Sequence, residues 1–195
     1  MQKSLLYLVN SSAYFLSHRN QIALAAKDFG FEVHVASPYD EKAEIIKEQG
    51  FIYHPVSISR SSINVFKELR SILNIYHLFR KIKPNVIHLI TIKPVIYGGI
   101  LSRITNVGSV VSAVPGLGFI FISRGLISKF RRALIIFMYK QAFTKNSLKV
   151  IFQNTEDRNT LIKETGLPSH KTILIRGSGV DLKIFSSIPI ANSKP

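Results

Sequence analysis

The sequence predicts a single α/β domain built on a doubly wound parallel sheet. Short, uninterrupted apolar runs such as 4–9 and 86–90 are typical of strands that are buried on both faces of a parallel sheet. These runs alternate with segments of helical periodicity, and repeated strand–helix–strand units form parallel sheets with right-handed crossovers. A chain of 195 residues can bury a core without disulfides, and this one contains no cysteine, which fits a cytosolic protein.

The elements follow from apolar runs that end at polar or glycine-containing breaks. The predicted strands cover 4–9, 31–36, 51–55, 86–90, 108–114 and 148–153. The predicted helices cover 13–29, 41–49, 63–82, 94–105 and 129–143, and a further helical stretch ends at Gly166 before a short apolar run. The spacing in helix 63–82 places these side chains on its buried side: Leu69, Ile72, Leu73, Tyr76 and Phe79.

One uncharged run, 104–123, is long enough to raise the question of a membrane span. It contains Gly108, Pro115, Gly116 and Gly118, and its apolar part divides into a β-branched run and a loop. The sequence therefore predicts a buried strand followed by a turn.

The chain is strongly basic, with 26 Lys and Arg residues, 11 Asp and Glu residues and a formal net charge of +15. No acidic residue occurs in 69–155, whereas Lys and Arg recur throughout that interval. A cationic middle predicts an anionic partner, which is a phosphate-bearing ligand, a nucleic acid or a lipid surface. Nucleic acid is the least favoured of the three, because no recognition-helix, RRM or KH signature occurs.

Ligands of doubly wound sheets bind at the carboxyl ends of the strands, where helix amino termini offer N–H groups to anions. Asn10, Ser11 and Ser12 follow the first predicted strand and could contact a ligand or simply cap the next helix. His18 and Arg19, one turn further on, could point toward the same edge or form a surface pair. No Gly-x-Gly-x-x-Gly or Walker-type motif occurs, so ordinary dinucleotide oxidoreductases and P-loop enzymes are disfavoured.

Later strands also end in candidate binding residues. Lys93 follows strand 86–90 beside a helix start, where a phosphate or sugar contact is favoured over a solvated lysine. The turn Gly116-Leu117-Gly118 predicts either close backbone approach to a ligand or a tight structural turn. His88 lies inside strand 86–90 between apolar neighbours and is interpreted as a core histidine in preference to a catalytic one.

The segment 119–145 interleaves aromatic and aliphatic residues with basic ones and has no acidic residue. A helix of this composition can lie among the headgroups of an anionic leaflet, although a crossover helix with a solvated basic face would look similar. The membrane interpretation is preferred, and its contact residues are Arg124, Lys129, Arg131, Arg132 and Lys140.

With these turns in place, the chain resembles the amino-terminal domain of GT-B glycosyltransferases of family 4, in the bacterial branch that builds surface polysaccharides such as lipopolysaccharide and capsule, or lipid-linked oligosaccharides. The matching motifs are Phe15-Leu16-Ser17-His18-Arg19, the run 30–36, the run 91–98, the run 116–121, the run 150–154 with Asp157, and Gly177-Ser178-Gly179-Val180-Asp181 with Phe185. Together these motifs span nearly the whole chain.

The resemblance implies two Rossmann-like domains that face one another across a cleft. Residues 1–176 would form the acceptor-side domain, and 177–195 a hinge toward an absent carboxyl-terminal donor-binding domain. The implied acceptor site comprises Asn10, Ser11, Ser12, His18, Arg19, Lys93, Gly116, Leu117 and Gly118. The implied donor or hinge side comprises Gln153, Asn154, Arg176, Gly177, Ser178, Gly179, Val180 and Asp181.

The resemblance also implies sugar transfer with retained configuration, from a nucleotide sugar, for which a UDP-sugar is expected, to a polyprenyl-diphosphate-linked saccharide. No metal or other cofactor is implied, and the place of action would be the cytoplasmic face of the plasma membrane. Two features depart from the family, namely the missing domain with its glutamate pair and the missing histidine after strand 108–114, so no catalytic residue is assigned. The alternative is a non-catalytic binding module or one subunit of a split enzyme.

Overall fold

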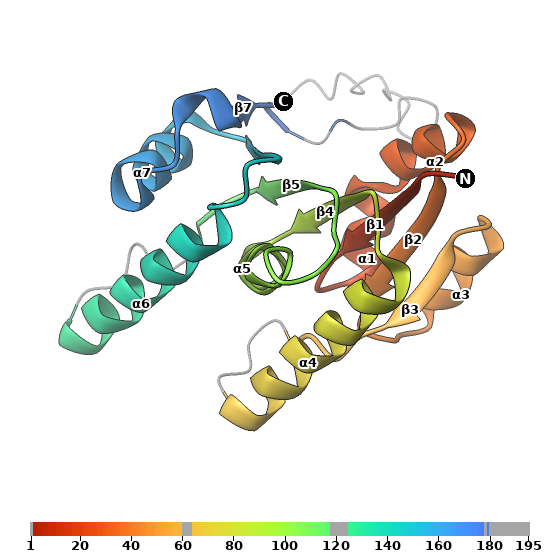
Figure 1. The fold of residues 1–195 in the computed structure, drawn as a ribbon, viewed down its shortest axis with the longest axis horizontal. Coiled ribbons are helices and arrows are strands. Elements are labelled where there is room, and N and C mark those ends of the chain that lie inside the picture. The colour runs from red at the N-terminus through yellow and green to blue at the C-terminus, as the bar shows by residue number, and fades with distance from the viewer. Residues whose placement is uncertain (1, 60–63, 118–124, 178, 180–195) are drawn as a thin grey trace, which may run out of the picture.

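The chain folds around a seven-stranded, entirely parallel sheet with helices on both faces (Figure 1). This computed structural model describes residues 2–59, 64–117, 125–177 and 179. The strand order is β3-β2-β1-β4-β5-β6-β7. The chain adds β2 and β3 on one side of β1, then crosses back to place β4 on the other side, so the strand order reverses between β1 and β4. The Rossmann-like, doubly wound sheet predicted from the sequence is confirmed.

The strands agree with their predicted positions to within one or two residues. Their bounds are Ser4–Leu8 (β1), Glu32–Ser37 (β2), Ile52–Pro55 (β3), Val86–Ile90 (β4), Ser109–Val114 (β5), Leu148–Phe152 (β6) and Thr172–Leu174 (β7). The run 104–123 contributes β5, as predicted for its strand, and the turn predicted after it lies partly outside the described residues. No helix within the described segments is long and apolar enough to cross a bilayer.

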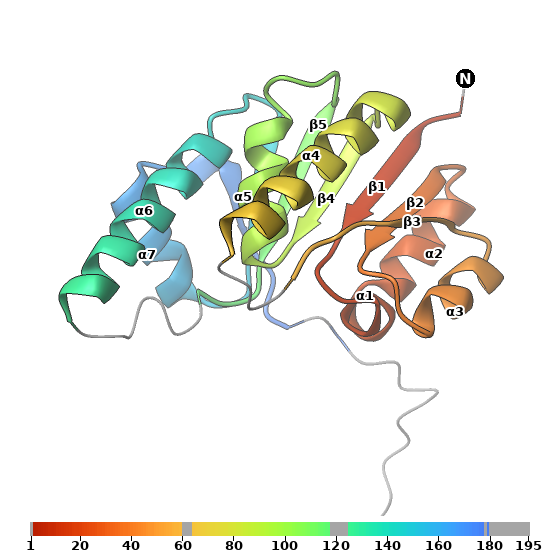
Figure 2. The same ribbon diagram turned by 90° about the horizontal axis from the view of Figure 1, so that it is seen from below.

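Two layers of helices cover the sheet, and Figure 2 shows them on opposite sides. The helices are Ser12–His18 (α1), Asn20–Asp28 (α2), Lys42–Glu48 (α3), Val65–Ile82 (α4), Ile92–Leu101 (α5), Leu126–Ala142 (α6) and Thr155–Thr165 (α7), with a short 3-10 helix at Ser169–Lys171. Phe15, Ala23 and Ile46 bring α1, α2 and α3 into one buried cluster. The cluster on the other face includes residues of α4 to α7.

The single helix predicted for 13–29 is wrong, because the chain forms two helices that meet at Arg19. Arg19 leaves helical geometry at φ −128° and ψ −11°. Its Nη1 donates a hydrogen bond to the carbonyl oxygen of His18 at 2.9 Å. A side chain that bonds to nearby backbone competes with the helical hydrogen bonds and so favours a break at this point.

The face of α4 that packs on the sheet differs from the prediction in part. Phe79 is buried, and Ile72 and Tyr76 pack partly buried against the core as expected, but Leu69 and Leu73 are exposed. The buried positions are Ser71, Ile75 and Phe79, which are spaced by four residues and share one side of the helix. The small Ser71 fits because its hydroxyl donates to backbone carbonyl oxygens of Ser57 and Lys67.

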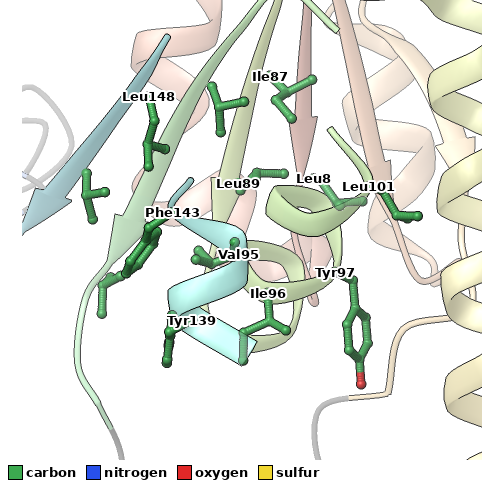
Figure 3. Close-up of a cluster of buried hydrophobic side chains, with 14 of the residues drawn as sticks. Leu8, Ile87, Leu89, Val95, Ile96, Tyr97, Leu101, Tyr139, Phe143 and Leu148 are labelled. Atoms are coloured by element: carbon green, nitrogen blue, oxygen red, sulfur yellow. The ribbon is translucent and has the colours of Figure 1, made fainter. Parts of the chain in front are cut away.

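Helix α5 lies at the centre of the larger core, between the sheet and α6 (Figure 3). It begins at Ile92, two residues before the predicted start at Pro94, and proline is tolerated in a first turn because the amide there needs no helical acceptor. Gly99 faces Ala142 of α6, and a Cβ at Gly99 would lie 2.9 Å from the carbonyl oxygen of Ala142. The neighbouring Gly98 faces the Leu89 side chain of β4, so the two glycines let α5 pack closely against both the sheet and α6.

Candidate ligand pocket at the carboxyl edge of the sheet

A pocket of about 360 Å³ opens where the strand order reverses. Ligand sites of doubly wound sheets are found at this switch point, outside the carboxyl ends of the strands. Three strand ends contribute to it, those of β1, β4 and β5. Its lining residues are Asn10, Ser11, Tyr14, Thr91, Ile92, Lys93, Pro115 and Gly116.

The loop after β1 supplies two pocket residues and one structural residue. Asn10 and Ser11 line the pocket, and the Ser11 hydroxyl also caps α1 by accepting from the Tyr14 amide at 3.3 Å. Ser12 is fully buried, and its hydroxyl bonds to the Ser37 hydroxyl at 2.8 Å. Ser11 therefore takes the capping role and also lines the pocket, whereas Ser12 ties α1 to the end of β2.

Thr91 links β4 to α5 in a backbone conformation that glycine normally occupies, at φ 75° and ψ 169°. Its Oγ1 is buried and makes no hydrogen bond within the described chain. A β-branched residue in this region stores strain of about 1–3 kcal/mol, which the surrounding structure must hold in place. Such strain concentrates at ligand sites, and nothing in the sequence signals it.

Lys93 is held by the carboxylate of Glu68, a residue that was not among the predicted site residues. Its Nζ lies 2.6 Å from Oε1 of Glu68 on α4, and the Tyr97 hydroxyl donates to Oε2 of the same carboxylate at 2.6 Å. Both charged side chains are mostly buried, with 19% and 17% of their surface exposed. Burial and the Glu68 carboxylate together raise the pKa of Tyr97, so its hydroxyl stays protonated as a donor. Glu68 immediately precedes the acid-free interval, which is the one sequence signal that could have found it.

His18 is the last residue of α1, and Arg19 forms the junction between α1 and α2. His18 is exposed and stacks on Tyr14, with 4.2 Å between ring centroids, so it supports a pocket residue from outside the pocket. Arg19 is buried, and burial lowers the pKa of its guanidinium, while the nearby Tyr14 and Tyr7 raise it. Neither residue lines the pocket itself.

His88 is buried in β4 and stacks on Tyr7 of β1, with 5.2 Å between ring centroids. Burial, reinforced by the Arg19 charge, lowers the pKa of His88 to about 3. Its Nε2 and the Tyr7 hydroxyl have no hydrogen-bond partner among the described residues. The histidine is therefore a neutral core residue, as the sequence analysis interpreted it, and it is not poised for proton transfer near neutral pH.

Gly116 forms an open wall of the pocket, since a Cβ there would meet no atom within 4 Å. Leu117 is buried in the core beneath it. Gly118 lies outside the described residues. The turn after β5 thus offers backbone to the pocket at Gly116 and anchors itself through Leu117.

The predicted donor-side residues lie at the ends of β6 and β7, farther along the sheet. Asn154 caps α7, where its Oδ1 accepts from the Asp157 amide at 2.7 Å, and Gln153 precedes it half-buried. Arg176 and Gly177 follow β7, and Gly177 and Gly179 have positive φ values of 79° and 74°. Ser178, Val180 and Asp181 lie outside the described residues, as does nearly all of the predicted hinge 177–195.

The basic residues predicted to meet a membrane lie mainly on the outer side of α6. Lys129, Arg131 and Lys140 are exposed, and Arg124 lies outside the described residues. Arg132 instead donates to Oε1 of Glu164 on α7 at 2.9 Å. The exposed cations flank an apolar row on the same helix, formed by Phe130, Leu134 and Phe137.

The pocket combines hydroxyl and amide side chains, a paired lysine and the amino terminus of a helix. The Thr91 side chain at the start of α5 makes no capping hydrogen bond to the described residues, the first residues of α5 line the pocket, and helix amino termini attract anions. In the described part of the chain no group of three or more His, Asp or Glu side chains could hold a metal ion. The arrangement suits a ligand with both hydroxyl and phosphate groups.

A family model described as glycosyl transferase 4-like matches residues 4–154, which include the whole pocket. The chain belongs to this family. N,N'-diacetylbacillosaminyl-diphospho-undecaprenol α-1,3-N-acetylgalactosaminyltransferase of Campylobacter jejuni is 26% identical over 188 residues, which cover 96% of this chain and 50% of that enzyme. UDP-Gal:α-D-GlcNAc-diphosphoundecaprenol α-1,3-galactosyltransferase of Escherichia coli is 30% identical over 125 residues, which cover 64% of this chain and 31% of that enzyme.

Solved structures support the fold of this glycosyl transferase 4-like chain. HepE of Anabaena, solved with UDP and glucose, aligns over 96% of this chain and 47% of its own, with a TM-score of 0.66 and 14% identity. Sucrose-phosphate synthase of Thermosynechococcus elongatus aligns over 96% and 51%, with a TM-score of 0.65 and 12% identity. The chain therefore has the fold of one half of a GT-B enzyme, and it spans at most about half the length of the curated relatives it matches.

Proposed function

We propose that this chain is the amino-terminal, acceptor-binding part of a retaining glycosyltransferase. The enzyme would transfer a sugar from a nucleotide sugar, such as a UDP-sugar, to a polyprenyl-diphosphate-linked saccharide during the synthesis of a cell-surface glycan. The observation that carries this proposal is the pocket at the switch point, which places Lys93 and the amino terminus of α5 beside hydroxyl and amide side chains. The two curated relatives support it, since their names specify diphospho-undecaprenol-linked acceptors.

Each group in the pocket has a role in this proposal. The diphosphate of the acceptor would bind at the start of α5, where the helix dipole and the Lys93 ammonium favour anions. Asn10 and Ser11 would hydrogen-bond the acceptor sugar, and Gly116 would let it approach the backbone closely. Glu68 would hold Lys93 at the pocket wall, because leaving a mostly buried ammonium without its counter-charge would strongly destabilise the protein.

The donor would bind mainly to a carboxyl-terminal domain, in cis or in trans. Gln153, Asn154, Arg176 and Gly177, at the ends of β6 and β7, would lie on the side that faces that domain. Asp181 and the rest of 177–195 would form the connection. Arg124, Lys129, Arg131, Arg132 and Lys140 would hold the enzyme at the cytoplasmic face of the plasma membrane.

A bulky residue at Gly116 should block the acceptor without disturbing the fold. We expect Gly116→Val to weaken binding of a short-chain polyprenyl-diphosphate saccharide about tenfold, because its side chain would occupy open pocket space. Isothermal titration calorimetry on the 195-residue chain measures this change. Ala25→Val, on the exposed side of α2, is the matched control and should bind like the wild type.

Two outcomes would contradict the assignment. If Gly116→Val and Lys93→Ala both bind the acceptor like the wild type, the pocket is not the acceptor site. If the chain binds the acceptor but shows no sugar transfer once a carboxyl-terminal half is supplied, the alternative of a non-catalytic binding module is favoured.

A further inference from the structure

Helix α4 carries a second apolar row on the side that turns away from the sheet. Val65, Phe66, Leu69 and Leu73 are all exposed, with Phe66 84% and Leu69 53% exposed. Their spacing of three and four residues, with Val65 adjacent, places them on one side of the helix. The core side of α4 is formed separately by Ser71, Ile75 and Phe79. We call the four exposed residues the outer row of α4.

The charges around the outer row are basic. Lys67 and Arg70 are exposed on the same two turns of α4. The one acidic residue of these turns, Glu68, points inward and pairs with Lys93. The outward surface of the amino-terminal half of α4 is therefore apolar and cationic, which is the composition of helices that bind at an anionic lipid surface.

Helix α6 repeats this pattern on the same side of the sheet. Its apolar row of Phe130, Leu134 and Phe137 is flanked by the exposed Lys129, Arg131 and Lys140. Figures 1 and 2 both show α5 between α4 and α6. Two apolar, cationic helix faces therefore lie on either side of the helix whose amino terminus opens into the pocket.

We propose that the outer row of α4 is a second bilayer-docking surface, which inserts into the interface of an anionic leaflet together with the apolar row of α6. This inference rests on the proposed function for its place in the cell, but its evidence is the exposed row itself. Interfacial helices of this kind bury an apolar side among the headgroups and keep basic residues beside the lipid phosphates.

The ion pair between α4 and α5 then sets the depth of the pocket. Glu68 lies on the far side of α4 from Phe66, so Lys93 is about 10 Å from the outer row, roughly one helix diameter. An interfacial helix is buried by about 5–10 Å at the boundary between headgroups and acyl chains. Lys93 would therefore lie at the level of the headgroups, where a membrane-bound diphosphate also lies.

A single tryptophan can report insertion, because the chain contains none. We expect Phe66→Trp and Phe130→Trp each to shift to shorter emission wavelengths when vesicles of phosphatidylglycerol and phosphatidylethanolamine are added, with quenching by brominated acyl chains. Phe29→Trp, at an 86% exposed site on the other helix layer, should not respond. Vesicles of phosphatidylcholine alone should give a much weaker response for Phe66→Trp and Phe130→Trp.

The complementary measurement is vesicle co-sedimentation. Phe66→Ser combined with Leu69→Ser should lower the partition coefficient about tenfold, whereas the control Phe29→Ser combined with Ile45→Ser should leave it unchanged. The inference is overturned if Phe66→Trp does not respond while Phe130→Trp does, or if its emission is already blue-shifted without lipid because protein covers the row. Calorimetry with the short-chain acceptor separates this inference from the proposed function. The α4 variants should still bind the acceptor, because they change only the docking surface. If Gly116→Val does not weaken acceptor binding, that result contradicts the pocket assignment and leaves the docking surface unaffected.

Discussion

Replacing Gly99 with valine should destabilise the fold by about 3 kcal/mol. A Cβ at this position would lie 2.7 Å from the Cβ and 2.9 Å from the carbonyl oxygen of Ala142. Both atoms belong to Ala142, whose backbone and single methyl group cannot rotate aside, so α5 and α6 must separate. Because α5 and α6 share the core shown in Figure 3, the separation would open that core. Thermal unfolding should begin about 6–12 °C lower.

The control for this prediction is Gly116→Val, which makes the same chemical change in open space. We expect its free energy of unfolding to stay within about 0.5 kcal/mol of the wild-type value, so its unfolding temperature should hardly change. This result would also show that its weaker acceptor binding does not arise from unfolding. Equal melting temperatures for Gly99→Val and the wild type would mean that the α5–α6 interface can relax at little cost.

The fold could be predicted because the central strands β1 and β4 are short runs that are buried on both faces, although the edge strands β3 and β7 are only partly buried. β4 matched its predicted bounds, and β1 and β6 were each one residue shorter than predicted. The helices were less predictable wherever tertiary packing outweighed periodicity. α4 has two apolar rows, and the sequence alone does not show that the row with the small Ser71 is the one that meets the sheet.

The pocket was partly predictable, because the residues that follow parallel strands must meet at one edge of the sheet. Asn10, Ser11, Lys93 and Gly116 do line the pocket. Its other determinants depend on three-dimensional contacts that no local pattern records. Glu68 reaches Lys93 across 25 residues of sequence, and the strained backbone of Thr91 has no signature in its residue type.

Stability should fall as the pH drops from 7 to 5, and His88 should cause much of the loss. Burial, with Arg19 nearby, lowers the pKa of His88 to about 3 in the folded protein, whereas an unfolded histidine titrates near 6.5. The folded state therefore stays unprotonated while the unfolded state takes up a proton, so acid favours unfolding. The contribution is fully present above about pH 6.5 and is lost progressively toward pH 3, with about 2 kcal/mol lost between pH 7 and 5. Burial also lowers the pKa of His54, to about 4, which acts in the same direction.

The substitution His88→Phe isolates this effect, because it keeps a ring against Tyr7 while removing the titrating group. Urea unfolding at pH 7, 6 and 5 gives the free energy of unfolding at each pH, and its slope against pH measures how many protons the chain takes up on unfolding. Below pH 6 this number should be smaller for His88→Phe than for the wild type by close to one proton. His170→Phe, at an exposed site outside the core, should keep the slope of the wild type. If His88→Phe kept that slope as well, the buried imidazole would have to accept its proton in the folded state, and burial, with Arg19 nearby, could not be keeping it neutral.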